Sequence, residues 1–210
     1  MICRFGQLGF NSTTASAVPA QVLGSASANF SAVSACASSA CGVMPNGDAF
    51  CWGLNSLGQL GSASNDTMLP TQVAGATTFK LIKGLFQHFC AISAAGSSLL
   101  CWGSNSDGQI VATNSGSCPD LACRAPTQAA SSLSTVWADV AVGTAHSCGL
   151  LANASVVCWG SNNAGALGTG TFEASPGIPV KVASSLSFAS ISAGAWYTCG
   201  LTTTRQLFCW

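Results

Sequence analysis

Cysteine is the residue type whose spacing in this chain most directly predicts chemistry. Eight of the twelve cysteines form four pairs, with 10 or 11 positions from the first member to the second. The pairs are Cys41 with Cys51, Cys90 with Cys101, Cys148 with Cys158, and Cys199 with Cys209. A fifth pair, Cys118 and Cys123, encloses four residues. Regularly spaced thiols serve as disulfides or as zinc ligands, and the two uses predict different compartments.

The spacing favours disulfides over zinc. Structural zinc sites use Cys-x₂₋₄-Cys pairs, and Cys118-x₄-Cys123 stands alone with that spacing. Cysteines that face each other across an antiparallel hairpin have Cβ atoms about 4.5–5.5 Å apart, close to disulfide geometry. We therefore predict five disulfides and an oxidising compartment, outside the cell or at its surface. Two pairings stay open for Cys3 and Cys36: a bridge to each other, or a bridge from Cys3 to a cysteine outside this sequence.

Four sequons for N-glycosylation agree with export from the cell. They begin at Asn11, Asn29, Asn65 and Asn153. A chain this rich in Asn, Ser and Thr contains several such triplets by chance, so the sequons support secretion only together with the cysteines. Asn153 falls at a predicted hairpin tip and Asn65 in a predicted loop, where a glycan is tolerated.

Residues that commonly perform catalysis are sparse in this chain. Asp and Glu number six in total, too few for a carboxylate pair to stand out. His88 and His146 each precede a paired cysteine by two positions, but Ser39 and Tyr197 hold that position in the other pairs. A position that accepts His, Ser and Tyr within one chain indicates a polar structural residue near a strand. We expect no enzymatic activity, no metal and no cofactor.

The paired cysteines require strands that hold them opposite each other. The segments between them have the pattern strand–turn–strand, with turn residues such as those of residues 45–48 (PNGD) at the centre. A further apolar segment precedes each hairpin, and these predicted strands cover residues 30–35, 79–82, 136–142 and 188–193. Each cysteine pair is therefore predicted to lie in a small antiparallel sheet.

The hairpins belong to a longer repeat, with steps of 50, 57 and 51 residues between successive Cys-Trp pairs. A fixed period of this length indicates a solenoid, a propeller or an array, and a repeat of three or four short strands is typical of a propeller blade. GQLG at residues 6–9 matches the end of another copy, so we expect the chain to start inside one repeat and stop inside another. The recurring tryptophans are predicted to pack between blades; they are Trp52, Trp102, Trp159 and Trp210.

Composition limits the classes of partner. Charged residues make up 6% of the chain, against about 25% in an ordinary soluble domain, and the net charge is zero. Binding to phosphate backbones needs a basic surface, so no nucleic-acid partner is expected. No run of 18 apolar residues occurs, so we expect no membrane contact within this chain, although a full-length protein could be anchored elsewhere.

Two segments carry a resemblance to a known family. VAVGTAHSCGLLANASVVCWGSNNAGALGTG (140–170) and ISAGAWYTCGL (191–201) resemble the repeat of the regulator of chromosome condensation family, and the likeness covers essentially the whole chain. The resemblance implies a seven-bladed β-propeller. The cysteine-bearing form is similar to secreted bacterial propellers and to crinkly-type receptor-like kinase ectodomains. The chain departs from the repeat at Cys36, which replaces a glycine, and around Gly84, where one extra residue is expected before Cys90.

We therefore predict an all-β fold, a partial β-propeller with about four of seven blades, stapled by hairpin disulfides. The approximate repeats are residues 1–61, 62–111, 112–168 and 169–210. Residues 112–127 form an insertion that Cys118 and Cys123 are expected to close. Asp120 and Arg124 make this segment a candidate binding loop, and a tolerated surface insertion is the alternative. Four further aromatic residues either line a binding face or pack between blades: Phe86, Trp137, Trp196 and Tyr197.

The leading functional hypothesis is a non-catalytic binding module that is secreted or displayed at the cell surface. It would engage a protein or a glycan through its propeller loops, and a receptor-like kinase ectodomain is one setting for it. The resemblance also implies an alternative function, that of a guanine nucleotide-exchange factor or chromatin-type regulator. The zero net charge and the paired cysteines both argue against this alternative. A propeller hydrolase or lyase is the third hypothesis, and it would need a cluster of His and acidic residues that the sequence does not supply.

Overall fold

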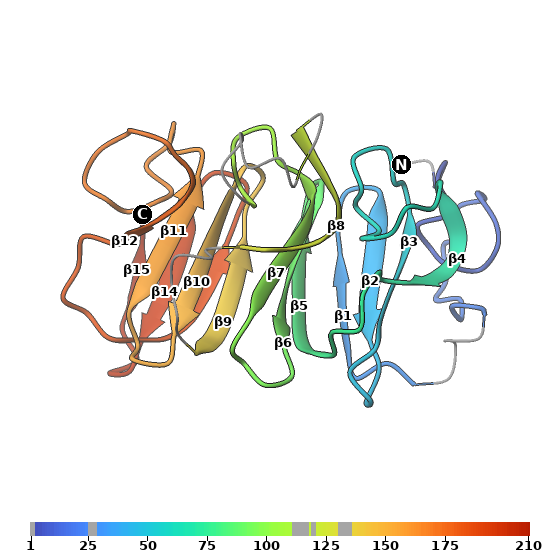
Figure 1. Cartoon of the computed structure of the whole chain (residues 1–210), viewed down its shortest axis with the longest axis horizontal. Coiled ribbons are helices and arrows are strands. Elements are labelled where there is room, and N and C mark those ends of the chain that lie inside the picture. Colours follow the sequence, from blue (N-terminus) through green and yellow to red (C-terminus); the bar gives the residue numbers. More distant parts are fainter. Residues whose placement is uncertain (1–2, 25–28, 111–117, 119–120, 130–135) are drawn as a thin grey trace.

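The computed structural model describes residues 3–24, 29–110, 118, 121–129 and 136–210. Within these residues, fifteen strands form four antiparallel sheets, which stand side by side in chain order (Figure 1). No helix in the described part of the chain is long and apolar enough to cross a bilayer. The predicted all-β, propeller-like architecture is therefore confirmed, and the row of sheets is open.

Three sheets have four strands and the last has three. The first contains β1 (Ala32–Ala35), β2 (Ser39–Val43), β3 (Ala49–Gly53) and β4 (Thr67–Gln72). The second contains β5 (Phe79–Leu85), β6 (His88–Ser93), β7 (Leu99–Ser104) and β8 (Ala122–Gln128). The third contains β9 (Trp137–Val142), β10 (His146–Leu151), β11 (Val156–Gly160) and β12 (Ser175–Lys181). The fourth contains β13 (Phe188–Ala193), β14 (Thr198–Thr202) and β15 (Leu207–Cys209).

The first three strands of every sheet lie where the repeat predicts them, but the sequence pattern did not locate the fourth strands. Each fourth strand contains proline: Pro70 in β4, Pro126 in β8, and Pro176 and Pro179 in β12. Proline lacks the backbone N–H that an inner strand must donate, and it is tolerated at a sheet edge. Each of these strands lies at the edge of its sheet, where proline also discourages pairing with another edge.

A β-bulge interrupts the pairing of the third and fourth strands at the same position in the first three sheets. The register shifts between Cys51 and Gly53 in the first sheet, and the second and third sheets repeat this shift. Gly53 has a φ of 106°, and a Cβ atom there would lie 2.4 Å from the carbonyl oxygen of Ser38. Glycine is therefore required after the first three Cys-Trp pairs, at Gly53, Gly103 and Gly160, because a side chain would collide with the turn between the first and second strands.

Disulfides cross the central hairpin of every sheet. Cys41 lies directly opposite Cys51 in the register of β2 and β3, and the other three hairpins repeat this pairing. The disulfides join Cys41 to Cys51, Cys90 to Cys101, Cys118 to Cys123, Cys148 to Cys158, and Cys199 to Cys209. Cys3 and Cys36 are free thiols, so the bridge between them is not formed.

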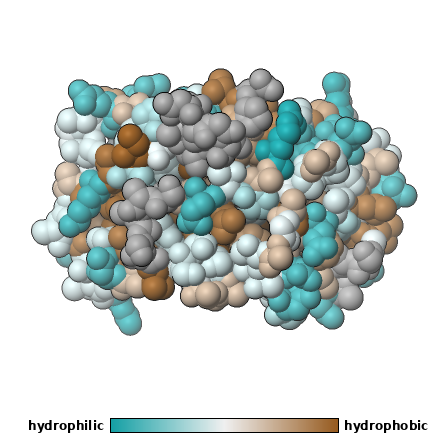
Figure 2. Space-filling model, viewed as in Figure 1, coloured by the Kyte–Doolittle hydropathy of each residue, from teal (hydrophilic) through white to brown (hydrophobic). Residues whose placement is uncertain are grey.

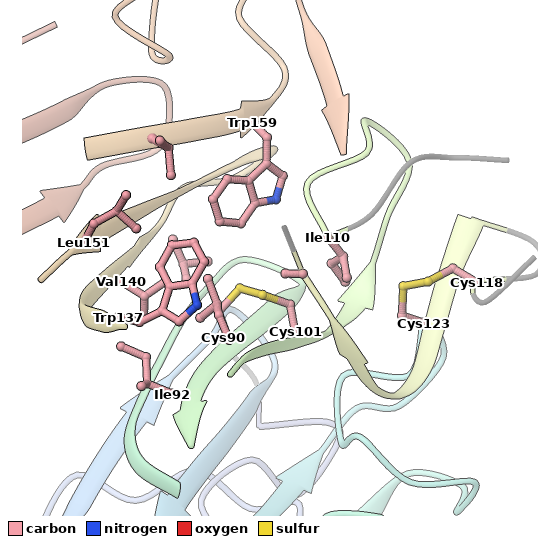
Figure 3. Packing of buried hydrophobic residues seen from close by; sticks show 14 residues of the cluster. Cys90, Ile92, Cys101, Ile110, Cys118, Cys123, Trp137, Val140, Leu151 and Trp159 are labelled. Carbon is pink, nitrogen blue, oxygen red and sulfur yellow. A yellow bond between two sulfur atoms is a disulfide. The ribbon is translucent and has the colours of Figure 1, made fainter. Parts of the chain in front are cut away.

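Large side chains fill the spaces between adjacent sheets. In the cluster shown in Figure 3, Trp137 and Trp159 lie beside the Cys90–Cys101 disulfide, with Ile92 and Val140 next to them. Trp102, Trp137 and Trp159 are fully buried. The indole Nε1 of Trp102 donates to the carbonyl oxygen of Gln59 in the preceding sheet's loop, at 3.0 Å. The prediction that the repeated tryptophans pack between blades is confirmed by these contacts.

The two departures from the repeat, at Cys36 and around Gly84, are explained by the turns between the first and second strands. The amide of Cys36 donates to the carbonyl of Ser39 at 2.8 Å, and the amide of Gly143 makes the same bond to His146 at 2.9 Å. A Cβ on Gly143 would lie 2.1 Å from the ring of His146, whereas the small Ser39 leaves room for Cys36. In the second sheet Leu85 pairs with His88 across a turn of the same length, so the expected extra residue before Cys90 is wrong.

Candidate binding surface

Because neighbouring strands are antiparallel, the connections between them lie alternately at the two ends of each sheet. Along the row of four sheets, these ends form two opposite rims. The short hairpin turns, such as residues 44–48, form one rim. The longer segments from the third to the fourth strand of each sheet form the other, which we call the loop rim: described residues 54–66, 105–110, 118, 121 and 161–174. Long connections on a stapled sheet are where binding residues usually lie, so the candidate surface is sought on the loop rim.

A buried asparagine organises each connection of the loop rim. Asn55, Asn105 and Asn162 follow the repeated Cys-Trp-Gly by two positions and are buried. The Asn162 Oδ1 accepts from the Leu167 amide at 2.9 Å, and its Nδ2 donates to two loop carbonyls, each at 2.9 Å. Asn55 and Asn105 accept in the same way from the amides five positions on. No role was predicted for these asparagines from the sequence, although their recurrence in each repeat was the available signal.

An open hollow lies on the loop rim between the first and second sheets. Its volume is about 520 Å³, and it is lined by Asn55, Ser56, residues 63–66 and Arg124. The Asp66 Oδ1 accepts from the amide of Asn55 at 2.7 Å. The Arg124 Nη2 donates to the Ser56 carbonyl at 3.3 Å. A carboxylate and a guanidinium group therefore face one hollow, and each is tied to the first sheet's loop.

Of the two residues of the candidate binding loop, the structure describes Arg124. Arg124 lies in β8 and is exposed, so it projects from a strand and not from the expected loop. Asp120 lies outside the described residues. The buried Cys118 is joined to Cys123, which is also in β8 opposite Gly103. β8, which carries Arg124, is therefore held by its pairing with β7 and by the Cys118–Cys123 disulfide.

The hollow is suited to binding by hydrogen bonds and charge. Arg124 presents guanidinium donors beyond the one bonded to Ser56, and Asp66 supplies acceptor oxygens. Such a set can contact the hydroxyl groups of a sugar or the polar groups of a peptide. The described residues contain no cluster of three or more His, Cys, Asp or Glu that could hold a metal ion. On the face shown in Figure 2, pale and teal areas of intermediate and high hydrophilicity are interspersed with small brown hydrophobic ones.

The four sequon asparagines are all exposed, namely Asn11, Asn29, Asn65 and Asn153. Asn153 lies in a hairpin turn, where its Oδ1 accepts from the amide and hydroxyl of Ser155 at 3.1 and 2.7 Å. Asn65 lines the hollow on the loop rim. Asn153 lies on the opposite rim, so a glycan on Asn153 would leave the hollow open. A glycan on Asn65 would occupy the hollow. Modification at these positions stays a prediction.

The aromatic residues outside the repeat consensus divide into two groups. Trp137 is fully buried and stacks over Gly149, where a Cβ atom would lie 2.2 Å from the ring. Phe86, Trp196 and Tyr197 are 46%, 51% and 55% exposed. Phe86 occupies the β5–β6 turn with a φ of 59°. Trp137 is therefore a packing residue, while the other three remain open to solvent.

The two histidines lie in a repeated hydrogen-bond chain between sheets. The Ser147 hydroxyl donates to the Gln109 carbonyl at 2.8 Å, so it accepts from the His88 Nε2, which is 3.0 Å away. The Trp159 Nε1 donates to the same carbonyl at 2.9 Å. Because Nε2 carries the proton, the Nδ1 of His88 is an acceptor, and it has no partner among the described residues. His88 therefore connects the second sheet to the third.

His146 repeats this chain one sheet further on. Its Nε2 is 3.0 Å from the Thr198 hydroxyl, which donates to the Ala166 carbonyl at 3.0 Å. The Trp210 Nε1 donates to that carbonyl at 3.0 Å. Burial lowers the pKa of His88 to about 3, with the nearby His146 charge as a second cause, and burial lowers the pKa of His146 to about 4. Both imidazoles are thus neutral structural groups, and the contacts that they make could not be predicted from the sequence.

Solved structures share this architecture. Yeast RCC1 (Prp20), in a structure bound to Kap60, is 20% identical, covers 87% of this chain and 43% of its own, and superposes with a TM-score of 0.74. Human WBSCR16 is 18% identical and covers 99% of this chain and 55% of its own, with a TM-score of 0.83. The CRINKLY ectodomain of the Arabidopsis thaliana receptor kinase ACR4 is 19% identical and covers 86% and 49%, with a TM-score of 0.53. These likenesses show the fold, and the chain spans about half the length of these structures.

Sequence comparisons identify the family. The human protein described as probable E3 ubiquitin-protein ligase HERC6 is 29% identical over 174 residues, which are 79% of this chain and 16% of the relative. The model of the regulator of chromosome condensation (RCC1) repeat matches residues 46–94 and 154–201. A second model of the same repeat matches residues 137–166, and together the matches cover more than half of the chain. The chain therefore belongs to the family of RCC1 repeat proteins.

Proposed function

We propose that this chain is a non-catalytic binding module that is secreted or displayed at the cell surface and engages a protein or a glycan through its loop rim. The observation that carries the proposal is the hollow between the first two sheets, where Asp66 and Arg124 face a volume of about 520 Å³. Both side chains are held by hydrogen bonds to the first sheet's loop. Groups that are fixed before binding lose less conformational entropy when a ligand arrives, which favours a recognition role.

The proposed compartment rests on the thiol chemistry. Five disulfides occur among the described residues, with one across the hairpin of each sheet. Disulfides persist where the surroundings are oxidising and are rare in the cytosol and nucleus. Four exposed sequons would be available to the glycosylation machinery of the secretory pathway. The fold shared with the ectodomains of two receptor kinases supports this setting, and a receptor kinase is one full-length context for the chain.

The test compares ligand binding by the wild-type chain with that of Arg124→Ala. The probes are a printed glycan array and a displayed peptide library, presented to the oxidised chain. We expect at least one class of probe to bind, and Arg124→Ala to weaken that binding about tenfold or more, as for an arginine at the centre of an interface. Arg205→Ala, which removes an exposed arginine on the hairpin rim, is the matched control and should bind like wild type. Binding that is equally insensitive to both changes would refute the role of the hollow.

Family membership favours a second candidate, a nucleotide-exchange factor or chromatin-type regulator. The yeast member Prp20p has been characterised by its binding to Gsp1p and histones. This candidate predicts that the chain binds such partners and accelerates GDP release from a small GTPase under reducing conditions. If the chain is a binding module, we expect no acceleration of GDP release. The chain has six Lys and Arg residues in total and no net charge, too few positive charges to form a basic surface.

A further inference from the structure

The sequon that begins at Asn153 lies in the turn between β10 and β11, where its side chains have a defined arrangement. The Asn153 Oδ1 accepts from both the amide and the hydroxyl group of Ser155, at 3.1 and 2.7 Å. The Asn153 Nδ2 has no hydrogen-bond partner within the described residues. The hydroxyl group that defines the sequon therefore contacts the amide that would be modified, and the nitrogen that would carry a sugar is free.

The hydroxyl groups of the other three sequons make different contacts. In the second sequon, the Ser31 hydroxyl donates to the Val43 carbonyl at 2.9 Å. In the third sequon, the Thr67 hydroxyl donates to the Leu69 carbonyl at 2.9 Å. In the first sequon, no hydrogen bond within the described part of the chain joins the threonine hydroxyl to the asparagine. Contact between the sequon hydroxyl and the acceptor amide is therefore particular to Asn153 among the four.

The equivalent turn of the first sheet uses its asparagine differently. Asn46 holds the position of Asn153, and its Oδ1 accepts from the Asp48 amide at 3.1 Å, as Asn153 accepts from Ser155. The Asn46 Nδ2, however, donates to the Asp48 carboxylate at 2.7 Å. With serine in place of this aspartate, the turn of the third sheet gains a hydroxyl donor and leaves its amide nitrogen unbonded.

A hollow opens beside Asn153 on the hairpin rim, and we call it the turn hollow. Its volume is about 210 Å³, and it lies between residues 153–156 and residues 181–188. The Phe188 amide donates to the Ala154 carbonyl at 2.8 Å, which joins the turn to the start of β13. Because the turn hollow is smaller than the usual ligand pocket of about 300–1,000 Å³, it suits a single sugar residue.

The lining of the turn hollow offers hydrogen-bond donors to a sugar. Lys181, Ser185 and Ser187 line it and are exposed, and their side chains have no hydrogen-bond partner in the described ranges. Ammonium and hydroxyl groups can donate to the hydroxyl and acetamido oxygens of N-acetylglucosamine. A sugar attached to Asn153 would be held beside these donors by its covalent bond, which gives it a high effective concentration there.

We propose that Asn153 carries an N-linked glycan whose first N-acetylglucosamine occupies the turn hollow. The proposal rests on the proposed entry into the secretory pathway, where the sugar donor is a lipid-linked oligosaccharide diphosphate. The Asn153 Nδ2 forms a bond to the anomeric carbon of the sugar, the bond from that carbon to the diphosphate breaks, and Nδ2 loses one proton. The bound sugar would connect the β10–β11 turn with the segment that leads to β13, and the loop rim would stay open to ligand.

Site-specific mass spectrometry tests the modification. The chain is directed into the secretory pathway of cultured human cells by an added signal peptide, and the secreted, oxidised protein is analysed peptide by peptide. We expect a glycan on Asn153, its loss in Ser155→Ala, and its retention in Ala154→Gly, which keeps the sequon and suits the φ of 67°. An unmodified Asn153 in secreted, oxidised protein would overturn the proposal and leave the proposed compartment standing, so the two failures are distinguishable.

The rate of enzymatic release tests the place of the first sugar. Peptide-N-glycosidase must reach the bond to Nδ2, so native protein should release the Asn153 glycan about tenfold more slowly than reduced, unfolded protein, as one or two hydrogen bonds to the sugar would give. Ser187→Trp fills the turn hollow and Lys181→Met removes a donor, so both should raise the native rate. Ser97→Trp, at an exposed serine of the β6–β7 turn, is the matched control and should behave like wild type. Equal native rates for wild type and both lining variants would overturn the proposed place of the sugar.

Discussion

Acidification should destabilise this protein through its two buried histidines. His88 and His146 are 0% and 1% exposed, and each holds its single ring proton on Nε2 toward a hydroxyl group of the next sheet. A second proton on His88 would place a buried charge and a new donor on Nδ1, which has no partner among the described residues. Protonation is therefore opposed in the folded state and unopposed in the unfolded chain.

The direction and size of the effect follow from proton linkage. The folded pKa values lie at about 3 for His88 and about 4 for His146, against 6.5 for the ordinary side chain. Above pH 6.5 both states are neutral and the histidines do not affect stability. Below it the unfolded chain binds protons that the folded chain does not, so stability falls as the pH falls toward the folded pKa values. At pH 5 each imidazole should remove on the order of 2 kcal/mol from the free energy of unfolding.

Urea unfolding followed by tryptophan fluorescence measures this loss at pH 7.5 and pH 5, at one protein concentration. We expect the midpoint to fall with pH, with a slope that corresponds to about two protons. In His146→Gln the amide can still donate to Thr198 but cannot titrate, so the slope should fall to about one proton. A midpoint that is the same at both pH values, or a variant with an undiminished slope, would refute the assignment of buried neutral imidazoles.

Two substitutions test the contacts between and within sheets, both by urea unfolding at pH 7.5. Trp159→Phe removes the indole donor to Gln109 and should cost about 1 kcal/mol more than Trp137→Phe, because the Trp137 Nε1 has no partner in the described part of the chain. Asn162→Ala removes four hydrogen bonds within its loop and should cost about 2–3 kcal/mol, whereas Asn46→Ala in an exposed turn should cost less than about 1 kcal/mol. Equal losses within either pair would contradict these roles.

Features encoded over short distances in the sequence were predictable. The 10- and 11-residue spacing of cysteines predicts the hairpins, because residues opposite each other in neighbouring strands are close enough to form a disulfide. The period of about 50 residues then fixes the row of sheets and the place of each tryptophan between them. These predictions were possible because the pattern repeats. One copy alone would not distinguish a hairpin from an unrelated apolar segment.

Features that depend on neighbouring repeats were missed. The fourth strands lie far along the chain from their partners and contain proline, so Arg124 was expected in a loop although it lies in β8. His88 and Ser147 are 59 positions apart, and their hydrogen bond exists only because adjacent sheets stack in register. The variation among His, Ser and Tyr at this position correctly indicated a structural role, but it could not show what each side chain contacts.

The central claim is that disulfides staple these sheets in an oxidising compartment. Peptide mass spectrometry of the natively expressed, folded protein under non-reducing conditions tests it most directly. We expect links across the four hairpins, as between Cys148 and Cys158, together with the Cys118–Cys123 link and free thiols at Cys3 and Cys36. Twelve free thiols in native protein would contradict the claim and would make the intracellular regulator the leading candidate.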